Sequence, residues 1–207
     1  MNLTGESKFF IGIILATVAI IIGGVFFMSK PEKLLEKSEL IPAGSQIKGN
    51  SEASDYLVEF SDFQCPACGA FYPQVKSLVN ANKDKLSLSY RHFPLDQHKM
   101  AVPAALAAEA AAEQGKFWEM HDYIFENQAG LSEEMLLSAG EKLGLDKAKY
   151  EEAYKNKKYQ EKVSKDLADG KRFSVNATPT FFLNGKKLNP VNFDDLKRSV
   201  EEELKKN

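Results

Sequence analysis

Cysteine is scarce in this chain: its 207 residues contain only two, Cys65 and Cys68. A structural zinc site needs four ligands, and a single C-x-x-C pair supplies only two of them. An excess of charge is also lacking, because 27 basic residues are balanced by 29 acidic ones for a net charge of −2. Since no long basic stripe accompanies this balance, nucleic acid is not an expected partner.

What the chain does have is an apolar N-terminal segment, FFIGIILATVAIIIGGVFFM, which covers residues 9–28 without a charge. As a helix, a segment of this length spans about 30 Å, the thickness of the hydrocarbon core of a bilayer. A cleavable signal peptide is the alternative, but its apolar region is usually about 7–15 residues and ends at small residues. The following VFFMSKPEK has no such pattern. We therefore predict one uncleaved transmembrane helix within an anchor at residues 1–29.

The rest of the chain has the composition of one globular domain, with 43% hydrophobic and 27% charged residues overall. The polar stretch at residues 30–50 contains prolines and glycines and predicts a tether. We expect the folded domain to occupy residues 51–207. Within it, residues 56–63 and 86–93 are rich in β-formers, and the stretch between them has apolar positions at helical spacing. This pattern predicts a βαβ unit.

Helix formers dominate the next segment, residues 96–173, which is too long for a connecting loop. There the spacing of Trp118 with neighbouring aromatic residues predicts the core of an inserted helical subdomain. TFFL, a turn at Asn184-Gly185 and KKL then predict a β-hairpin, followed by a last helix at residues 193–205. The fold class expected from these elements is α/β with a helical insertion.

Four roles compete for the cysteine pair. A structural staple is weak, because closing so short a ring is worth only about 2 kcal/mol. A zinc site would need His92 and His98, at a gap from Cys68 that is longer than the usual spacing. Without that metal, these two histidines and His121 are expected to be structural or surface groups. A pair of inert buried thiols is the third role, and redox catalysis is the fourth.

The local sequence favours redox catalysis. Cys65 follows a predicted strand and begins a predicted helix, so Cys65 and Cys68 share one helix face within reach of a disulfide. Unpaired N–H groups of the first turn and the helix dipole stabilise the Cys65 thiolate, which lowers the pKa of this thiol. Pro66 fits a position whose N–H has no helical partner. We expect Cys65 to be exposed at the tip and Cys68 to be buried.

Three segments, EFSDFQCPACGAFYP, GKFWEMHDYIFENQ and VNATPTFFLNGKKL, together resemble the DsbA-like thiol-disulfide oxidoreductases of the thioredoxin superfamily, in their membrane-tethered bacterial form. The resemblance covers most of residues 50–207. It implies a thioredoxin fold with an inserted helical subdomain, preceded here by one N-terminal transmembrane helix. It also implies that Cys65 and Cys68 are catalytic and that no cofactor or metal is needed.

Other positions around the cysteines take roles from this resemblance. Thr178 and Pro179 match the cis-proline loop, although an ordinary trans proline stays open. Glu59 matches the acidic residue beneath the second cysteine, where a buried carboxyl of raised pKa suits proton exchange. A wetter position for Glu59 is the alternative. The residues expected to contact a substrate are Pro66, Ala67, Thr178 and Pro179.

The resemblance implies an oxidase that introduces disulfides into cysteine-containing translocated proteins. Its implied partner is a quinone-linked membrane reoxidant of the DsbB or VKOR type. Strongly oxidising relatives have histidine at the position of Ala67, so a milder oxidant is expected here. A reductase or isomerase of extracytoplasmic proteins is one alternative. A membrane-tethered metal-binding or chaperone module is an alternative of another class.

The orientation of the anchor is contested by two signals. More lysines follow the apolar segment than precede it, which would place the domain in the cytoplasm. Disulfide formation belongs outside the cytoplasm, and a long folded domain can be translocated despite its charge. We therefore expect a single-pass protein of the cell membrane with an extracytoplasmic catalytic domain.

Overall fold

The computed structural model describes residues 5–28 and 34–206 and, within the first helix, the side chains of residues 11–23. The chain divides into two compact units, residues 1–33 and 34–207. The first unit contains helix α1 (Gly5–Met28). Among the residues described, none of the helices has the length and hydropathy that a bilayer crossing requires. Part of the expected anchor lies outside the described residues, and the anchor stays a prediction.

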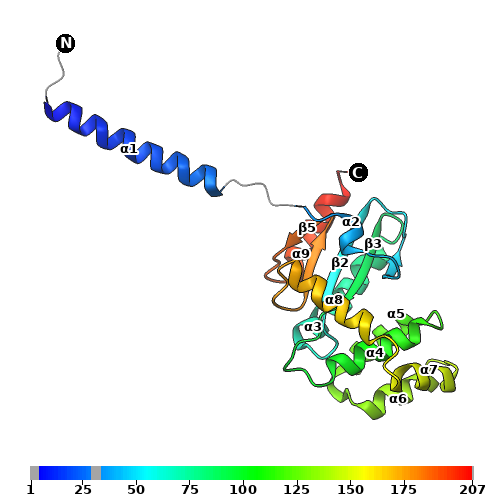
Figure 1. The fold of residues 1–207 in the computed structure, drawn as a ribbon. Coiled ribbons are helices and arrows are strands. Elements are labelled where there is room, and N and C mark those ends of the chain that lie inside the picture. The colour runs from blue at the N-terminus through cyan, green and yellow to red at the C-terminus, as the bar shows by residue number, and fades with distance from the viewer. Residues whose placement is uncertain (1–4, 29–33, 207) are drawn as a thin grey trace. The chain divides into compact units, whose positions relative to one another are not determined.

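A mixed sheet with the strand order β1-β3-β2-β4-β5 forms the centre of the second unit (Figure 1). β2 and β3 are parallel, and the other neighbouring strands are antiparallel. Every residue of β2 and β3 is buried, as expected for strands covered on both faces. The strands are β1 (Gln46–Gly49), β2 (Asp55–Ser61), β3 (Leu86–His92), β4 (Thr180–Leu183) and β5 (Lys186–Leu188).

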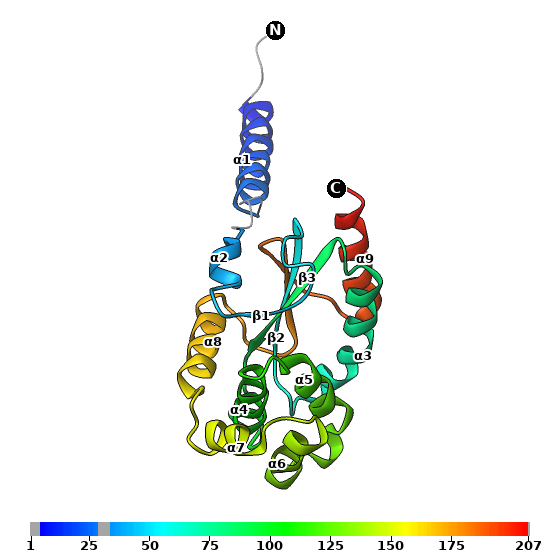
Figure 2. The same ribbon diagram turned by 90° about the vertical axis from the view of Figure 1, so that its right-hand side faces the viewer.

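Helices flank this sheet on either side, and a helical subdomain lies at one end (Figure 2). The alanine-rich α4 is almost entirely buried in that subdomain. The run from α4 to α8 fills residues 101–172, within the segment where we expect the insertion. The helices are α2 (Lys37–Leu40), α3 (Pro66–Ala81), α4 (Ala101–Ala112), α5 (Phe117–Glu126), η1 (Gln128–Gly130), α6 (Glu133–Lys142), α7 (Lys147–Lys155), α8 (Gln160–Arg172) and α9 (Phe193–Leu204).

Alternation along β2 decides which side chain meets which helix. Leu57 packs in the core formed with α3 and α9. Val58 and Phe60 pack on the other face, in the core that includes Leu40 of α2. Because successive side chains of a strand point to opposite faces, Glu59 points toward the α3 face. This places its carboxyl on the side of the sheet that carries the C-x-x-C helix.

The prediction of a tether at residues 30–50 is wrong for most of that segment. α2 and β1 belong to the folded unit: Leu40 is fully buried, and β1 pairs with β3. The glycines taken as linker signals serve turns instead, with φ of +81° at Gly44 and +87° at Gly49. The sequence signal of β1 is weak because it is a short edge strand without a fully buried residue.

Trp118 lies at the junction between the helical subdomain and the sheet. Its Nε1 donates a hydrogen bond to the carbonyl of Ile47 on β1 at 3.0 Å. Phe117, Met120 and Phe125 are buried in the subdomain core, as expected. Trp118 itself is only half-buried and also packs against the core of the sheet. It therefore joins two parts of the fold instead of filling the interior of one.

Candidate active site

Cys65 lies where the chain turns from β2 into α3. It is the N-cap residue of α3, with φ −70° and ψ 122°, and Pro66 occupies the first turn. The Cys65 N–H donates to the carbonyl of Asp62 at 3.0 Å, and the Cys65 carbonyl accepts from the N–H of Gly69 at 3.1 Å. The thiols of Cys65 and Cys68 are both free. Cys65 thus caps the helix that we expected it to begin.

Cys65 is less accessible than expected. Its exposed fraction is 7%, against 0% for Cys68. The loop before β4 lies against it, because the Cys65 Sγ–H donates to the carbonyl of Thr178 at 3.4 Å. The Thr178–Pro179 peptide bond in this loop is cis. The sequence gives no sign that this loop would shield the nucleophile, since more than a hundred residues separate them.

Several groups stabilise the thiolate of Cys65. The largest contribution is a hydrogen bond from the thiol of Cys68. Burial opposes it, and the side chain of Thr178 and the N–H groups of Cys68 and Ala67 support it. The pKa of Cys65 is thereby lowered from 9.0 to about 5. At neutral pH the reduced site therefore carries a thiolate at Cys65. Pro66 and Ala67 are exposed beside it.

The pKa values of Cys68 and Glu59, which lie behind Cys65, are raised and not lowered. Burial raises the pKa of Cys68, and so do its hydrogen bond to Cys65 and the charge of Glu59. Glu59 is only 3% exposed. Burial raises the pKa of Glu59 from 4.5 to about 7, and the hydroxyl of Ser61 opposes this rise. Glu59 is therefore about half ionised at neutral pH, close enough to Cys68 to act on its pKa.

Gln128, which follows α5, holds the active-site turn from the helical subdomain. Its Nε2 donates to the carbonyls of Phe63 at 2.8 Å and of Cys65 at 3.0 Å. A Cβ at Gly69 would lie 2.3 Å from Gln128 Oε1, so glycine at this position leaves room for the amide. Nothing local in the sequence marks Gln128, 63 residues away, as a partner of Cys65.

Asp62 fixes the same turn from its other side. Its buried carboxylate accepts from the N–H of Leu95 at 2.8 Å and from the N–H of Gln64 at 2.7 Å. It also contacts Nδ1 of His98 at 2.7 Å. The loop that carries His98 is thereby tied to the residues before Cys65. His98 has the structural role that we expect for it, at a place that the sequence does not indicate.

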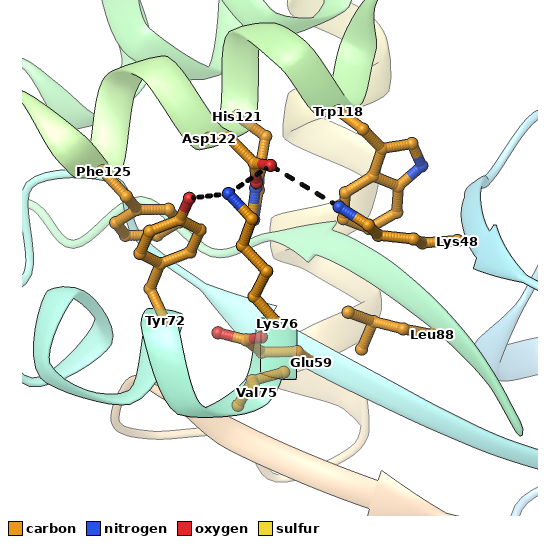
Figure 3. A pocket seen from close by; sticks show the side chains of 10 residues that line it. All are labelled: Lys48, Glu59, Tyr72, Val75, Lys76, Leu88, Trp118, His121, Asp122 and Phe125. Carbon is orange, nitrogen blue, oxygen red and sulfur yellow. Dashed lines mark hydrogen bonds and ion pairs between the residues drawn. The ribbon is translucent and has the colours of Figure 1, made fainter. Parts of the chain in front are cut away.

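Glu59 also lines a narrow cavity between α3, α5 and β1 (Figure 3). The cavity measures about 10 Å³, which leaves room for about one water molecule. On its solvent side, Asp122 Oδ2 lies 2.9 Å from Lys76 Nζ and 3.5 Å from Lys48 Nζ. His121, whose pKa is lowered by burial, contacts Asp122 Oδ1 at 2.9 Å. The three charged side chains neutralise one another in part above the buried carboxyl.

The histidines considered as zinc ligands have other partners. His92 Nε2 contacts Glu109 Oε1 at 2.9 Å, and His98 contacts Asp62. In the described part of the chain, no group of three or more histidine, cysteine and acidic side chains is arranged to hold a metal ion.

Comparison with known proteins agrees with this geometry. The thioredoxin family model, described as "Thioredoxin", matches residues 43–202. A thioredoxin-like oxidoreductase from Silicibacter pomeroyi is 25% identical, with a TM-score of 0.70 over 83% of this chain and 99% of that one. DsbA2 from Pseudomonas aeruginosa is 26% identical, with a TM-score of 0.64 over 81% of this chain and 97% of that one. The chain belongs to the thioredoxin family and shares its fold with DsbA-like proteins.

A curated relative carries a different name. The Na(+)/H(+) antiporter NhaA 3 from Salinispora tropica is 40% identical over 163 residues, which are 77% of this chain but only 24% of that protein. The chain thus spans about a quarter of the length of this relative. The antiporter name describes a much longer protein, and the shared segment is only about a quarter of it.

Proposed function

We propose that the chain introduces disulfides into cysteine-containing proteins that have crossed the membrane, with Cys65 and Cys68 as its redox pair. The observation that carries this proposal is the Cys65 thiol, whose pKa is lowered to about 5 beside the Thr178–Pro179 loop. A thiolate that is stable at neutral pH is a good leaving group, so a disulfide formed by Cys65 is readily attacked and reduced.

In the proposed reaction, the oxidised site holds a Cys65–Cys68 disulfide. A substrate thiolate attacks Cys65 Sγ, the Cys65–Cys68 bond breaks, and its electron pair goes to Cys68. Glu59 supplies the proton that converts Cys68 to a thiol. The second thiolate of the substrate then attacks its own bridged sulfur and releases Cys65 as a thiolate. The substrate loses two electrons and two protons; Cys68 keeps one proton and the other passes to solvent.

Substrate contact is proposed for the four residues around the nucleophile. Pro66 and Ala67 are exposed next to Cys65, and Thr178 and Pro179 form the facing loop. A substrate peptide would lie along this loop and pair with its backbone in an extended conformation. The mixed disulfide would thereby be held while the second substrate cysteine reacts.

The direction of the reaction is part of the proposal. The low pKa of Cys65 favours the reduced form of the site and therefore an oxidant, whereas Ala67 lacks the histidine of strongly oxidising relatives. Equilibration of the full chain with glutathione buffers measures the potential. A value near that of thioredoxin, about −270 mV, would support the reductase alternative instead.

Location and reoxidation are proposed from the N-terminal segment. The large apolar side chains described in α1, such as Ile20 with 73% exposure, suit a lipid environment. A helix anchored there, with the catalytic domain outside the cytoplasm, would meet a quinone-linked membrane reoxidant of the DsbB or VKOR type. Membrane fractionation and protease protection of the full chain in intact cells would test the anchor and its orientation.

A Cys68→Ala variant of the full chain tests the function directly. Without Cys68 to displace it, a substrate should remain bound to Cys65 as a mixed disulfide that reducing agents release. Cys65→Ala is the matched control and should trap nothing. Absence of adducts from the Cys68→Ala variant, under conditions in which the wild-type site is reduced and reoxidised, would refute the proposed catalysis.

A further inference from the structure

Two buried hydroxyl groups lie behind the cysteine pair. Among the described residues, neither Ser61 Oγ nor Tyr90 Oη meets the distance and angle limits of a hydrogen bond, although Ser61 lies close enough to Glu59, Cys68 and Tyr90 to act on the pKa of each. Both side chains are almost completely buried, at 1% exposure each. Buried polar groups are nearly always paired, so two buried hydroxyls this close to a buried carboxyl are suited to bind it when it is ionised.

The strand register places both residues beside Glu59, and the charges of Glu59 and Cys68 act on the Tyr90 hydroxyl. Tyr90 on β3 is the direct neighbour of Glu59 on β2. Ser61 follows Glu59 by two positions, so its side chain lies on the same face of the sheet. The hydroxyl of Ser61 acts on the pKa of three groups, namely Glu59, Cys68 and Tyr90. Ser61 is therefore the common neighbour of Tyr90 and of the two groups that exchange the proton, Glu59 and Cys68.

We propose that Ser61 and Tyr90 are positioning residues of a proton relay in which their hydroxyls hold the ionised carboxylate of Glu59 while it exchanges a proton with Cys68. This inference rests on the proposed function. When Cys68 leaves the disulfide, the Glu59 carboxyl O–H gives its proton to the Cys68 sulfur. Tyr90 and Ser61 then turn their O–H groups to the carboxylate that remains. Water returns the proton to Glu59, and no other bond changes.

Tyr90 is suited to this role because it stays a phenol. Burial first, and then the charges of Glu59 and Cys68, raise its pKa well above 10.0, so it can only donate to a carboxylate at working pH.

The cavity of Figure 3 supplies a route for the returning proton, because Glu59 lines it and its solvent side is formed by charged groups. The titratable groups around Glu59 are Lys48 of β1, Asp62 after β2, Cys68, Tyr72 and Lys76 of α3, Tyr90 of β3, and His121 and Asp122 of α5.

A Tyr90→Phe variant of the full chain tests the relay. It removes the hydroxyl and keeps the ring. The assay measures the release of glutathione from a Cys65–glutathione mixed disulfide, a step in which Glu59 must take the proton of Cys68. If one hydrogen bond to the carboxylate is worth about a factor of ten in acidity, the ionised fraction of Glu59 at pH 7 falls from about one half to about one tenth.

We therefore expect release at pH 7 to be about five-fold slower in Tyr90→Phe and the midpoint of the pH profile to move above the wild-type value near 7. Tyr150→Phe is the matched control: its buried hydroxyl donates to the carbonyl of Leu136 in the helical subdomain, so its loss should leave the profile unchanged. Ser61→Ala should shift the midpoint in the same direction as Tyr90→Phe and serves if Tyr90→Phe folds poorly.

A double-mutant cycle separates a relay from a structural effect. In a Glu59→Gln background, Tyr90→Phe should have no further effect on the rate, because the carboxylate that it assists is gone. Two results would refute the relay without affecting the proposed function. One is an equal effect of Tyr90→Phe on the rate with and without Glu59. The other is a pH midpoint that stays at the wild-type value in both Tyr90→Phe and Ser61→Ala. A wild-type chain that releases no glutathione through Cys68 would overturn the proposed function, and the relay with it.

Discussion

The acidity of Cys65 should depend more on Cys68 than on any other group of the site. The hydrogen bond from the Cys68 thiol is the largest of the contributions that lower the pKa of Cys65 to about 5. A hydrogen bond to a charged group contributes about 1.5–3 kcal/mol, or about one to two pH units of acidity. We therefore expect Cys68→Ala to raise the pKa of Cys65 to about 6–7.

Thiolate absorbance near 240 nm, followed against pH in the reduced chain, measures this pKa directly. Wild type should show one transition near 5, because the other thiol, that of Cys68, has a raised pKa and stays protonated. Cys68→Ser is the matched control, since a hydroxyl can donate the same hydrogen bond. Its transition should stay close to that of wild type, while that of Cys68→Ala moves to higher pH.

A transition near 5 in Cys68→Ala would refute this reasoning. It would mean that the N–H groups of the first helical turn and Thr178 suffice to hold the thiolate. A transition near 9.0 in wild type would be more serious, because no group around Cys65 would then stabilise the thiolate, and the main support for catalysis would be lost.

Three further predictions concern the same turn. Thr178→Val should raise the pKa of Cys65 by less than Cys68→Ala does, since the contribution of Thr178 is the smaller one; the same titration checks this order. In the reduced chain, the free energy of unfolding of wild type, taken relative to that of Cys65→Ser, should rise with pH between about 5 and 9.0. In this range the unfolded Cys65 thiol still binds a proton that the folded one has lost. Urea denaturation at several pH values measures the difference between the two proteins, and a difference that does not change with pH would contradict the prediction. Gln128→Ala should lower the free energy of unfolding by about 1–2 kcal/mol, because two carbonyls lose a donor, whereas the exposed Gln74→Ala should change it little. Equal losses of unfolding free energy in the two glutamine variants would contradict the role of Gln128 in holding the active-site turn.

The parts of the site that lie close together in sequence could be predicted. Cys65, Cys68 and Glu59 belong to one strand, turn and helix, so local spacing and the family resemblance place them together. The hairpin after Pro179 could also be predicted from the sequence, because Asn184-Gly185 specifies a tight turn, in which both residues have positive φ. Short-range rules suffice where the chain itself holds the residues together.

The rest depends on contacts between distant segments. Tyr90 becomes a neighbour of Glu59 only through the register of β2 and β3, which no local pattern specifies. Gln128 reaches Cys65 from the helical subdomain, and the shielding of Cys65 comes from the Thr178 loop. The sequence did not indicate that the folded unit begins before residue 50. β1 is stabilised by its pairing with β3, and its short sequence carries no signal of that pairing.

The position of Trp118 makes the protein its own reporter. As the single indole of the chain, hydrogen-bonded to the edge strand at Ile47, it is the only source of tryptophan emission. Any displacement of the helical subdomain from the sheet would change the polarity around this ring, since its Nε1 would exchange a carbonyl for water. Fluorescence recorded during reduction and reoxidation can therefore follow that displacement without an added label.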